Sequence, residues 1–163
     1  MTAEKPLWGG RFARPPAEAL RAFTVSLPYD QRLWREDLAS TAAHARTLER
    51  AGILTPEERV MIESVCDEAA AEFQAGTFRF DPTDEDIHSA VERFLTRRLG
   101  DIGAKIHAGR SRNDLVASDL RLWSKTAALS IAGDVAGLES ALLAQAEAHA
   151  STLAPGYTHL QRA

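Results

Sequence analysis

The segment GRSRND at residues 109–114 concentrates groups that bind carboxylates: two guanidiniums, a hydroxyl and an amide. It stands directly before a long helical pattern, so Ser111, Asn113 or Asp114 is positioned to cap that helix. The free N–H groups and the dipole of a helix start attract an anion, and arginine adds bidentate recognition of a carboxylate. The type and spacing of these residues support an anion site and an ordinary capped helix start about equally.

A second polar segment, PGYTHLQ at residues 155–161, follows the same helical pattern and contains a hydroxyl, an imidazole and an amide. The imidazole of His159 can transfer protons near neutral pH. A lone histidine in a turn is more often only hydrogen-bonded or solvated. The spacing by itself therefore favours a structural role for His159.

The acidic segment DEDIH at residues 84–88 is typical of a helix start, where the helix dipole favours negative charge. Asp86 and His88 are two residues apart and lie on different faces of a helix, which argues against a metal-binding pair. The other histidines are scattered, no His/Cys set has zinc spacing, and neither glycine-rich nucleotide-binding motif occurs. We expect no metal and no cofactor.

Composition limits the class of protein. The 163 residues are 45% hydrophobic and 26% charged, which is ordinary for a globular chain that buries its own core. The formal net charge of −4 gives no field that would draw the protein to nucleic acid or to an anionic membrane. The N-terminus has no apolar signal region, no 18 apolar residues run together, and Cys66 is the single cysteine. These features predict a soluble, cytoplasmic protein with Cys66 as a small core residue.

The helices around the polar segments are predicted by apolar residues at steps of three and four. Three such patterns occupy the first hundred residues, and a glycine ends each of them. The second pattern begins at TPEE, residues 55–58, which predicts a capping box with proline at the first helical position. Residues 77–81 are expected to be extended and residues 105–113 to form a loop. The predicted helices follow Asp30, Thr55 and Thr83 and end at Gly52, Gly76 and Gly100.

The first 28 residues contain Gly-Gly and Pro-Pro pairs that break regular structure. We expect an extended arm there, with at most one short helix near residues 17–23. Trp8, Phe12 and Phe23 are the apolar residues that would anchor the arm to the helices that follow.

From residue 114 to residue 149 no proline interrupts the helical pattern. A helix of that span is roughly 50 Å long and needs more partners than this chain supplies. Gly133 and Gly137 share one face, which favours close contact with another helix. We expect an all-α fold, with a helical N-terminal domain over residues 1–104 and the start of a helical-bundle domain over 105–163 that is cut short. The apolar stripe of the long helix comprises Val116, Leu120, Trp123, Ala127, Ile131, Val135, Leu138 and Leu142.

Four motifs occur together in a recognisable order and spacing. LWGGRF at residues 7–12 and DEDIH at 84–88 are followed by GRSRND at 109–114 and PGYTHLQRA at 155–163. With these motifs the chain resembles the N-terminal part of the argininosuccinate lyase family, within the fumarase/aspartase superfamily, over essentially all of its length. The first and third motifs distinguish this family from its fumarase and aspartase relatives.

The resemblance implies cleavage of argininosuccinate to arginine and fumarate without cofactor or metal, in arginine biosynthesis. It also implies a homotetramer whose long helices form a central bundle, with each active site assembled from several subunits. His159 would be the acid/base histidine or the residue that tunes it, and Thr158 would hold a substrate carboxylate. The resemblance further implies substrate binding by Ser26 and Asp30 at the arginine end, by Ser111, Arg112 and Asn113 around the carboxylate that gains charge, and by Asp86 and His88 near the site.

Two features set this chain apart from a complete member of that family. Leu115 stands where the family usually has glutamine, which removes an amide that could support the loop. The family's flexible loop with its catalytic serine lies beyond residue 163, so we expect the chain by itself to be inactive. Two other functions stay open: a sister lyase acting on another fumarate adduct, and a non-catalytic helical assembly module, or truncated paralogue, that binds lyase subunits.

Overall fold

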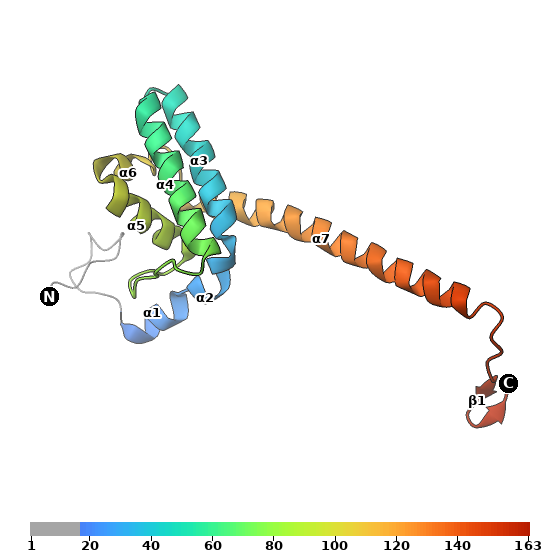
Figure 1. Ribbon diagram of the computed structural model, residues 1–163. Helices are drawn as coiled ribbons and strands as arrows, with labels where there is room; N and C mark the ends of the chain where they lie inside the picture. The colour runs from blue at the N-terminus through green and yellow to red at the C-terminus, as the bar shows by residue number, and fades with distance from the viewer. Residues whose placement is uncertain (1–16) are drawn as a thin grey trace. The chain divides into compact units, whose positions relative to one another are not determined.

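A computed structural model describes residues 17–163 of the chain (Figure 1). Its regular structure is almost entirely helical, which confirms the predicted all-α fold. The LWGGRF motif and the expected anchors Trp8 and Phe12 lie outside the described residues. The chain divides into two compact units, one ending at Trp123 and the other spanning Ser124–Ala163, and each is described by itself. The predicted domain boundary after residue 104 stays a prediction.

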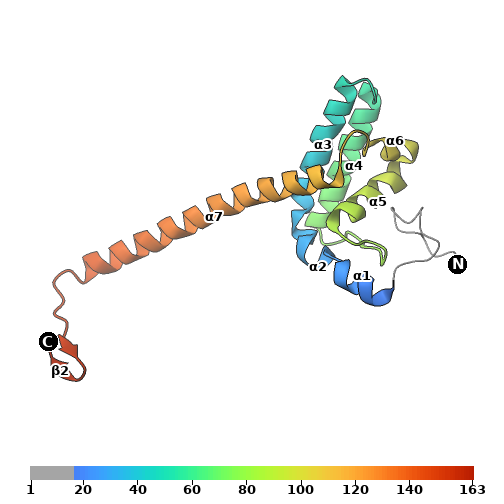
Figure 2. The ribbon, with the colours of Figure 1, turned by 180° about the vertical axis from the view of Figure 1, so that it is seen from behind.

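The helices α3 (Trp34–Arg50) and α4 (Pro56–Gln74) form a helical hairpin and lie side by side in both views of the ribbon (Figure 1, Figure 2). Gly52 adopts φ +72°, a left-handed backbone that favours glycine, and this turn ends α3 as predicted. At the start of α4, Thr55 Oγ1 accepts from the N–H of Glu58 at 3.2 Å, and Glu58 Oε2 accepts from the N–H of Thr55 at 2.9 Å. The predicted capping box is confirmed.

Replacing Thr55 with alanine removes one half of this capping box. We expect the free energy of unfolding of the first unit to fall by about 1 kcal/mol, because the N–H of Glu58 loses its acceptor. Urea unfolding followed by circular dichroism measures the change. Thr47→Ala is the matched control, because Thr47 lies on the exposed surface of α3, where alanine is the better helix former. Equal losses in the two variants would contradict the capping role.

The helix α5 (Ile87–Leu99) packs against both α3 and α4, and Gly100 ends it as predicted. The short helix α6 (Asp101–Lys105) follows directly, so the loop expected over residues 105–113 is confined to residues 106–111. Residues 77–81 belong to no helix or strand. Phe23 is 88% exposed, so the expectation that it anchors the arm is wrong. Three short elements precede α3: α1 (Glu18–Thr24), α2 (Leu27–Asp30) and the 3₁₀ turn η2 (Gln31–Leu33).

The apolar core of the first unit comes largely from the predicted faces of α3, α4 and α5. Val60 of α4 is 53% exposed, because it lies two residues from the buried Ile62 and so on another face of the helix. Cys66 is buried, and burial raises the pKa of its thiol to about 12, as expected of a core residue rather than a nucleophile. The buried core residues are Leu38, Ala45, Leu48, Leu54, Ile62, Val65, Cys66, Ala69, Phe78, Ile87, Ala90, Val91, Leu95 and Ile106.

The predicted long helix is confirmed as α7 (Arg112–Ala148), 37 residues in length. In the first unit it buries Leu115 and Asp119, which are 4% and 0% exposed. The predicted stripe is wrong in this part of the helix, because Val116 and Leu120 are 38% and 52% exposed. The buried face is offset from the predicted stripe by one residue, about 100° around the helix. Apolar periodicity missed this face because one of its members is an aspartate.

The second unit comprises the rest of α7 and a hairpin of β1 (Tyr157–Thr158) and β2 (Gln161–Arg162). All residues from position 128 onward are exposed within the chain. A Cβ added at Gly133 or Gly137 would meet nothing within 4 Å, so the close helix contact expected there is not made by the described residues. The exposed apolar side chains of this part of α7 are Leu129, Ile131, Val135, Leu138, Leu142 and Leu143.

By length and composition α7 is also long and apolar enough to cross a membrane. Residues 127–144 contain only two charged side chains, Asp134 and Glu139. The sequence predicted no membrane span because no 18 apolar residues run together. That criterion missed this stretch, in which the apolar residues are interrupted. Charged side chains are costly in the middle of a membrane span, and a helix packed inside a bundle of protein helices has a similar composition.

Candidate functional site

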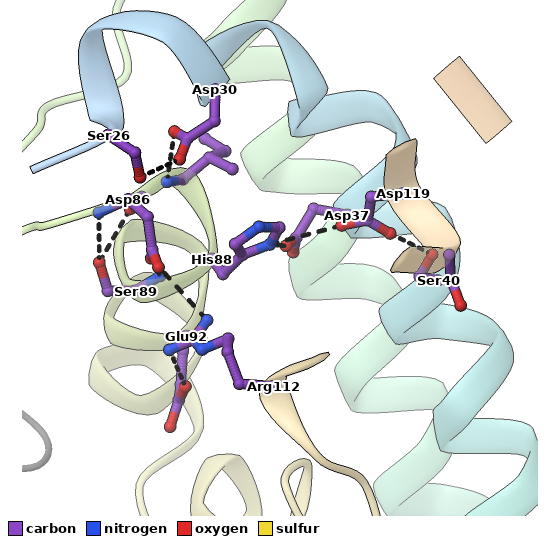
Figure 3. Close-up of polar contacts among 12 residues, drawn as sticks. Ser26, Asp30, Asp37, Ser40, Asp86, His88, Ser89, Glu92, Arg112 and Asp119 are labelled. Atoms are coloured by element: carbon purple, nitrogen blue, oxygen red, sulfur yellow. Dashed lines mark hydrogen bonds and ion pairs between the residues drawn. The ribbon is translucent and has the colours of Figure 1, made fainter. Parts of the chain in front are cut away.

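The start of α5 is the point at which several predicted site residues meet (Figure 3). Asp86 is the N-cap: its Oδ1 accepts from the N–H of Ser89 at 2.6 Å, and Ser89 Oγ accepts from the N–H of Asp86 at 3.1 Å. This capping box satisfies backbone groups that the first turn of a helix leaves free. The acidic segment is therefore a helix start, as its composition predicted, and the Asp86 carboxylate is held in a defined position.

Ser26 and Asp30 join the start of α5 from the segment that contains α2. Ser26 Oγ donates to Asp30 Oδ2 at 2.6 Å, and Asp30 Oδ1 accepts from the N–H of Ile87 at 2.9 Å. The N–H of Ser26 donates to the carbonyl of Glu85 at 2.8 Å. These contacts place two predicted arginine-binding residues next to Asp86 and create a patch of carboxylates.

Arg112, the first residue of α7, faces this acidic patch (Figure 3). Its Nη2 donates to Glu92 Oε2 at 3.2 Å, and its Nη1 lies 3.9 Å from Asp86 Oδ1. Nη1 is buried and has no hydrogen-bond partner among the described residues. Its ion-pair partner is the Asp86 carboxylate, at a distance longer than a hydrogen bond, so Arg112 balances the charge of the acidic patch.

Ser111 caps α7, which decides among the three residues that the sequence left open. Its Oγ accepts from the N–H of Asn113 at 3.2 Å, and the N–H of Ser111 donates to Asp114 Oδ2 at 3.0 Å. Asn113 itself is exposed. Leu115, where a glutamine was expected from the resemblance, is buried and so takes part in packing.

His88 lies at the centre of a buried polar cluster that joins α3, α5 and α7 (Figure 3). Its Nδ1 donates to Asp37 Oδ2 at 2.5 Å and lies 3.4 Å from Asp119 Oδ2. Ser40 Oγ donates to Asp119 Oδ1 at 2.5 Å. The histidine and both aspartates are at most 3% exposed. We call Asp37, Ser40, His88 and Asp119 the buried ionic cluster.

The charges of the buried ionic cluster balance one another. Burial alone would lower the pKa of His88, but its side-chain interactions with Asp119 and Asp37 and the charge of Asp37 raise that pKa to about 9. Burial raises the pKa of Asp37 to about 6, against the lowering effect of His88. Between these two values the His88 imidazolium faces an ionised Asp37 carboxylate.

The sequence did not reveal the acidic partners of His88. One ligand atom from each of Asp37, His88 and Asp119 lies within 4.8 Å of the others, a spacing that could hold a metal ion. The expectation of no metal pair considered only neighbours in the chain, whereas these carboxylates come from other helices. The feature that the sequence analysis overlooked was an aspartate on a helix face whose other residues are buried. Protonated His88 itself places a positive charge beside the two carboxylates.

Thr158 and His159 belong to the hairpin of the second unit. Thr158 pairs with Gln161, and the connecting residues His159 and Leu160 have φ of 48° and 62°. Positive φ at two successive residues is typical of a tight hairpin turn, and in non-glycine residues it carries backbone strain. Both residues are exposed within the chain. Their participation in one site with residues of the first unit stays a prediction.

Comparison with known proteins gives the family. Over residues 10–163 the chain matches a family model described as lyase. The chain belongs to this lyase family. It is 48% identical over 157 residues to the argininosuccinate lyase of Roseiflexus castenholzii, 45% over 162 residues to that of Syntrophus aciditrophicus and 44% over 165 residues to that of Azotobacter vinelandii.

These alignments cover 96%, 99% and 100% of the chain but only 34%, 34% and 36% of the relatives. The chain thus spans about a third of the length of the curated relatives it matches. The resemblance to the N-terminal part of this lyase family is confirmed. In this lyase chain, helix capping and inter-helix contacts bring Ser26, Asp30, Asp86 and Arg112 together at one end of α5.

Proposed function

We propose that this chain is part of an argininosuccinate lyase, which removes fumarate from argininosuccinate and leaves arginine, without a cofactor. The observation that carries the proposal is the meeting of the carboxylates of Asp30 and Asp86 with the guanidinium of Arg112 at the start of α5. Argininosuccinate carries a guanidinium and several carboxylates, so opposite charges side by side suit its recognition. The identity of 44–48% to argininosuccinate lyases supports the same assignment.

The reaction explains why these residue types are needed. A proton leaves a carbon next to a carboxylate while a guanidinium nitrogen departs from the neighbouring carbon. The intermediate carries extra negative charge on that carboxylate, which preorganised donors and cations stabilise. We assign this role to Arg112, Ser111 and Asn113, whose capped turn opens α7. Ser26 and Asp30 would bind the guanidinium end, where a carboxylate is the matching partner.

The second unit supplies the remaining proposed groups. His159 would transfer a proton, or tune the group that does so, and Thr158 would hold a substrate carboxylate. The strained turn that holds His159 supports a functional role, since such strain clusters at functional sites. The loop with the catalytic serine belongs to the part of the family that the chain does not span, so we propose that residues 1–163 alone are inactive.

Fumarate absorbs ultraviolet light, so its release from argininosuccinate tests the proposal directly. The protein isolated from its native source is weighed by intact-mass spectrometry and assayed beside the polypeptide of residues 1–163. We expect a mass well above 17.8 kDa, turnover by the native protein and none by the shorter polypeptide. Normal turnover by residues 1–163 would contradict the proposed inactivity.

Two other outcomes would replace the proposed function. Fumarate release from adenylosuccinate or aspartate, with little from argininosuccinate, would identify a sister lyase. A native mass that matches residues 1–163, together with co-purification with lyase subunits and no turnover, would identify the assembly module. The exposed apolar face of α7 is the observation that favours this second candidate.

The same apolar face supports a proposal about assembly. We propose a homotetramer in which copies of α7 pack on one another, because Leu129, Ile131 and Val135 are half or more exposed in the single chain. Light scattering on the complete protein tests the tetramer, and a monomer would contradict it. A cytoplasmic location, proposed from the single cysteine, is tested by cell fractionation.

A further inference from the structure

The buried ionic cluster joins three helices, and the proposed function assigns no substrate contact to any of its members; His88, which the resemblance placed near the site, is buried within it. Asp37 and Ser40 come from α3, His88 from α5 and Asp119 from α7. Burying charges is costly unless they are paired, and a buried ion pair is no strong source of stability. The residues of this cluster therefore call for an explanation other than stability alone.

The cluster lies next to the proposed site on both α5 and α7. On α5, His88 is two residues from Asp86, the helix cap. On α7, Asp119 follows Arg112 by seven residues, close to two turns, so both project from the same face. Leu115 is buried on that face between them. A contact between Asp119 and His88 consequently sets the position of Arg112 relative to Asp86.

The carboxylate of Asp119 is held so that one oxygen is directed at His88. Ser40 Oγ donates to Oδ1 at 2.5 Å, which leaves Oδ2 at 3.4 Å from His88 Nδ1. Oδ2 is buried and has no hydrogen bond at normal distance among the described residues. An ionic contact of this kind depends on distance and direction, whereas an apolar contact tolerates sliding of one helix along another.

We propose that Asp119 is a positioning residue for the lyase reaction: through His88 it holds the first two turns of α7 in register with the start of α5, so that Arg112 and Asp86 present their charges to one substrate. The proposal rests on the proposed function. It assigns no contact with substrate to Asp119, and Ser40 supports it by orienting the carboxylate.

The attraction between Asp119 and His88 is ionic only while His88 is protonated, so its strength depends on pH. The charged groups that act on the cluster are Asp37 of α3, Asp86 of α5, Asp119 of α7 and Arg110 of the preceding loop. With a pKa of about 9, His88 loses its proton as the pH rises through that value, and the attraction to Asp119 is lost with it. Removing the charge of Asp119 lowers the pKa of His88 and moves this loss to lower pH.

The test uses Asp119→Asn in the complete enzyme, with Asp67→Asn as the matched control on the exposed surface of α4. We expect kcat/KM at pH 7.5 to fall about tenfold in Asp119→Asn, and its decline at alkaline pH to begin at lower pH than in the wild type. Asp67→Asn should match the wild type in both respects. Wild-type kcat/KM and an unshifted alkaline limb in Asp119→Asn would overturn the proposal, since a packing role alone is preserved by the isosteric amide.

Hydrogen–deuterium exchange of the same proteins separates this proposal from the proposed function. We expect faster exchange at the start of α7 in Asp119→Asn than in the control, whether or not the enzyme cleaves argininosuccinate. If the wild-type enzyme does not cleave it, the proposed function fails and the exchange result decides whether Asp119 holds the helix. Unchanged exchange overturns the inference. Should Asp119→Asn not fold, Ser40→Ala is measured instead, with a smaller change in the same direction expected and no change overturning the proposal.

Discussion

Replacing His88 with leucine is expected to lower the free energy of unfolding by about 3–5 kcal/mol. The variant leaves Asp37 and Asp119 buried without the imidazolium that faces both of them. Urea unfolding at pH 7.5, followed by circular dichroism and by tryptophan fluorescence, measures the loss. The matched control is His107→Leu, because the His107 side chain is 39% exposed and its Nδ1 lies 3.7 Å from Glu92. We expect a loss below about 1 kcal/mol for that exposed contact.

The cause of this loss is open to a direct check. Adding Asp37→Asn and Asp119→Asn to His88→Leu removes the unpaired charges, so much of the lost stability should return. Failure of the triple variant to recover stability would show that packing of the imidazole, rather than its charge, dominates. A loss below about 1 kcal/mol for His88→Leu alone would contradict the importance of the ionic contact.

The ionic contact of His88 also predicts how the stability of the protein depends on pH. The pKa of His88 is raised in the folded chain from 6.5 to about 9. Its contribution is therefore fully present below pH 6.5 and is lost as the pH rises through 9. The stability of the wild type should decline over this range, and His88→Leu should lack that decline.

Replacing His159 with alanine in the complete enzyme is expected to lower kcat by about a thousandfold, the range found for general acid–base residues. In the proposed function the imidazole transfers a proton or tunes the group that does so, and alanine can do neither. Fumarate release under saturating argininosuccinate measures kcat, and circular dichroism confirms that the variant is folded.

His149→Ala is the matched control for this substitution. His149 lies just after α7, is exposed, and contacts Thr152 Oγ1 at 3.2 Å. Its replacement should leave kcat within about twofold, since no proton transfer is assigned to it. Equal activity of the two variants would remove His159 from the mechanism.

The local structure could be predicted from the sequence because its causes act over a few residues. Thr55 and Glu58 form their capping box within one turn, and Gly52 and Gly100 end helices through their own backbone angles. The length of α7 follows from an unbroken helical pattern. The family also followed from the sequence, because its motifs are short, contiguous segments.

The buried face of α7 could not be predicted in this way. Periodicity pointed to Val116 and Leu120, whereas the fold buries Leu115 and Asp119. An aspartate is buried only where partners meet its charge, and these partners are His88 and Ser40 on other helices. No pattern within α7 contains that information.

The sequence by itself determined that this protein is a helical member of a lyase family, where its main helices end and where α4 begins. The tertiary structure decided which side chains meet. Asp30 reaches the N–H of Ile87 across 57 residues, and His88 reaches Asp37 across 51. Such contacts form only when packing brings distant helices together, because the free energy of burying a charge depends on the partner that packing supplies rather than on neighbours in the chain.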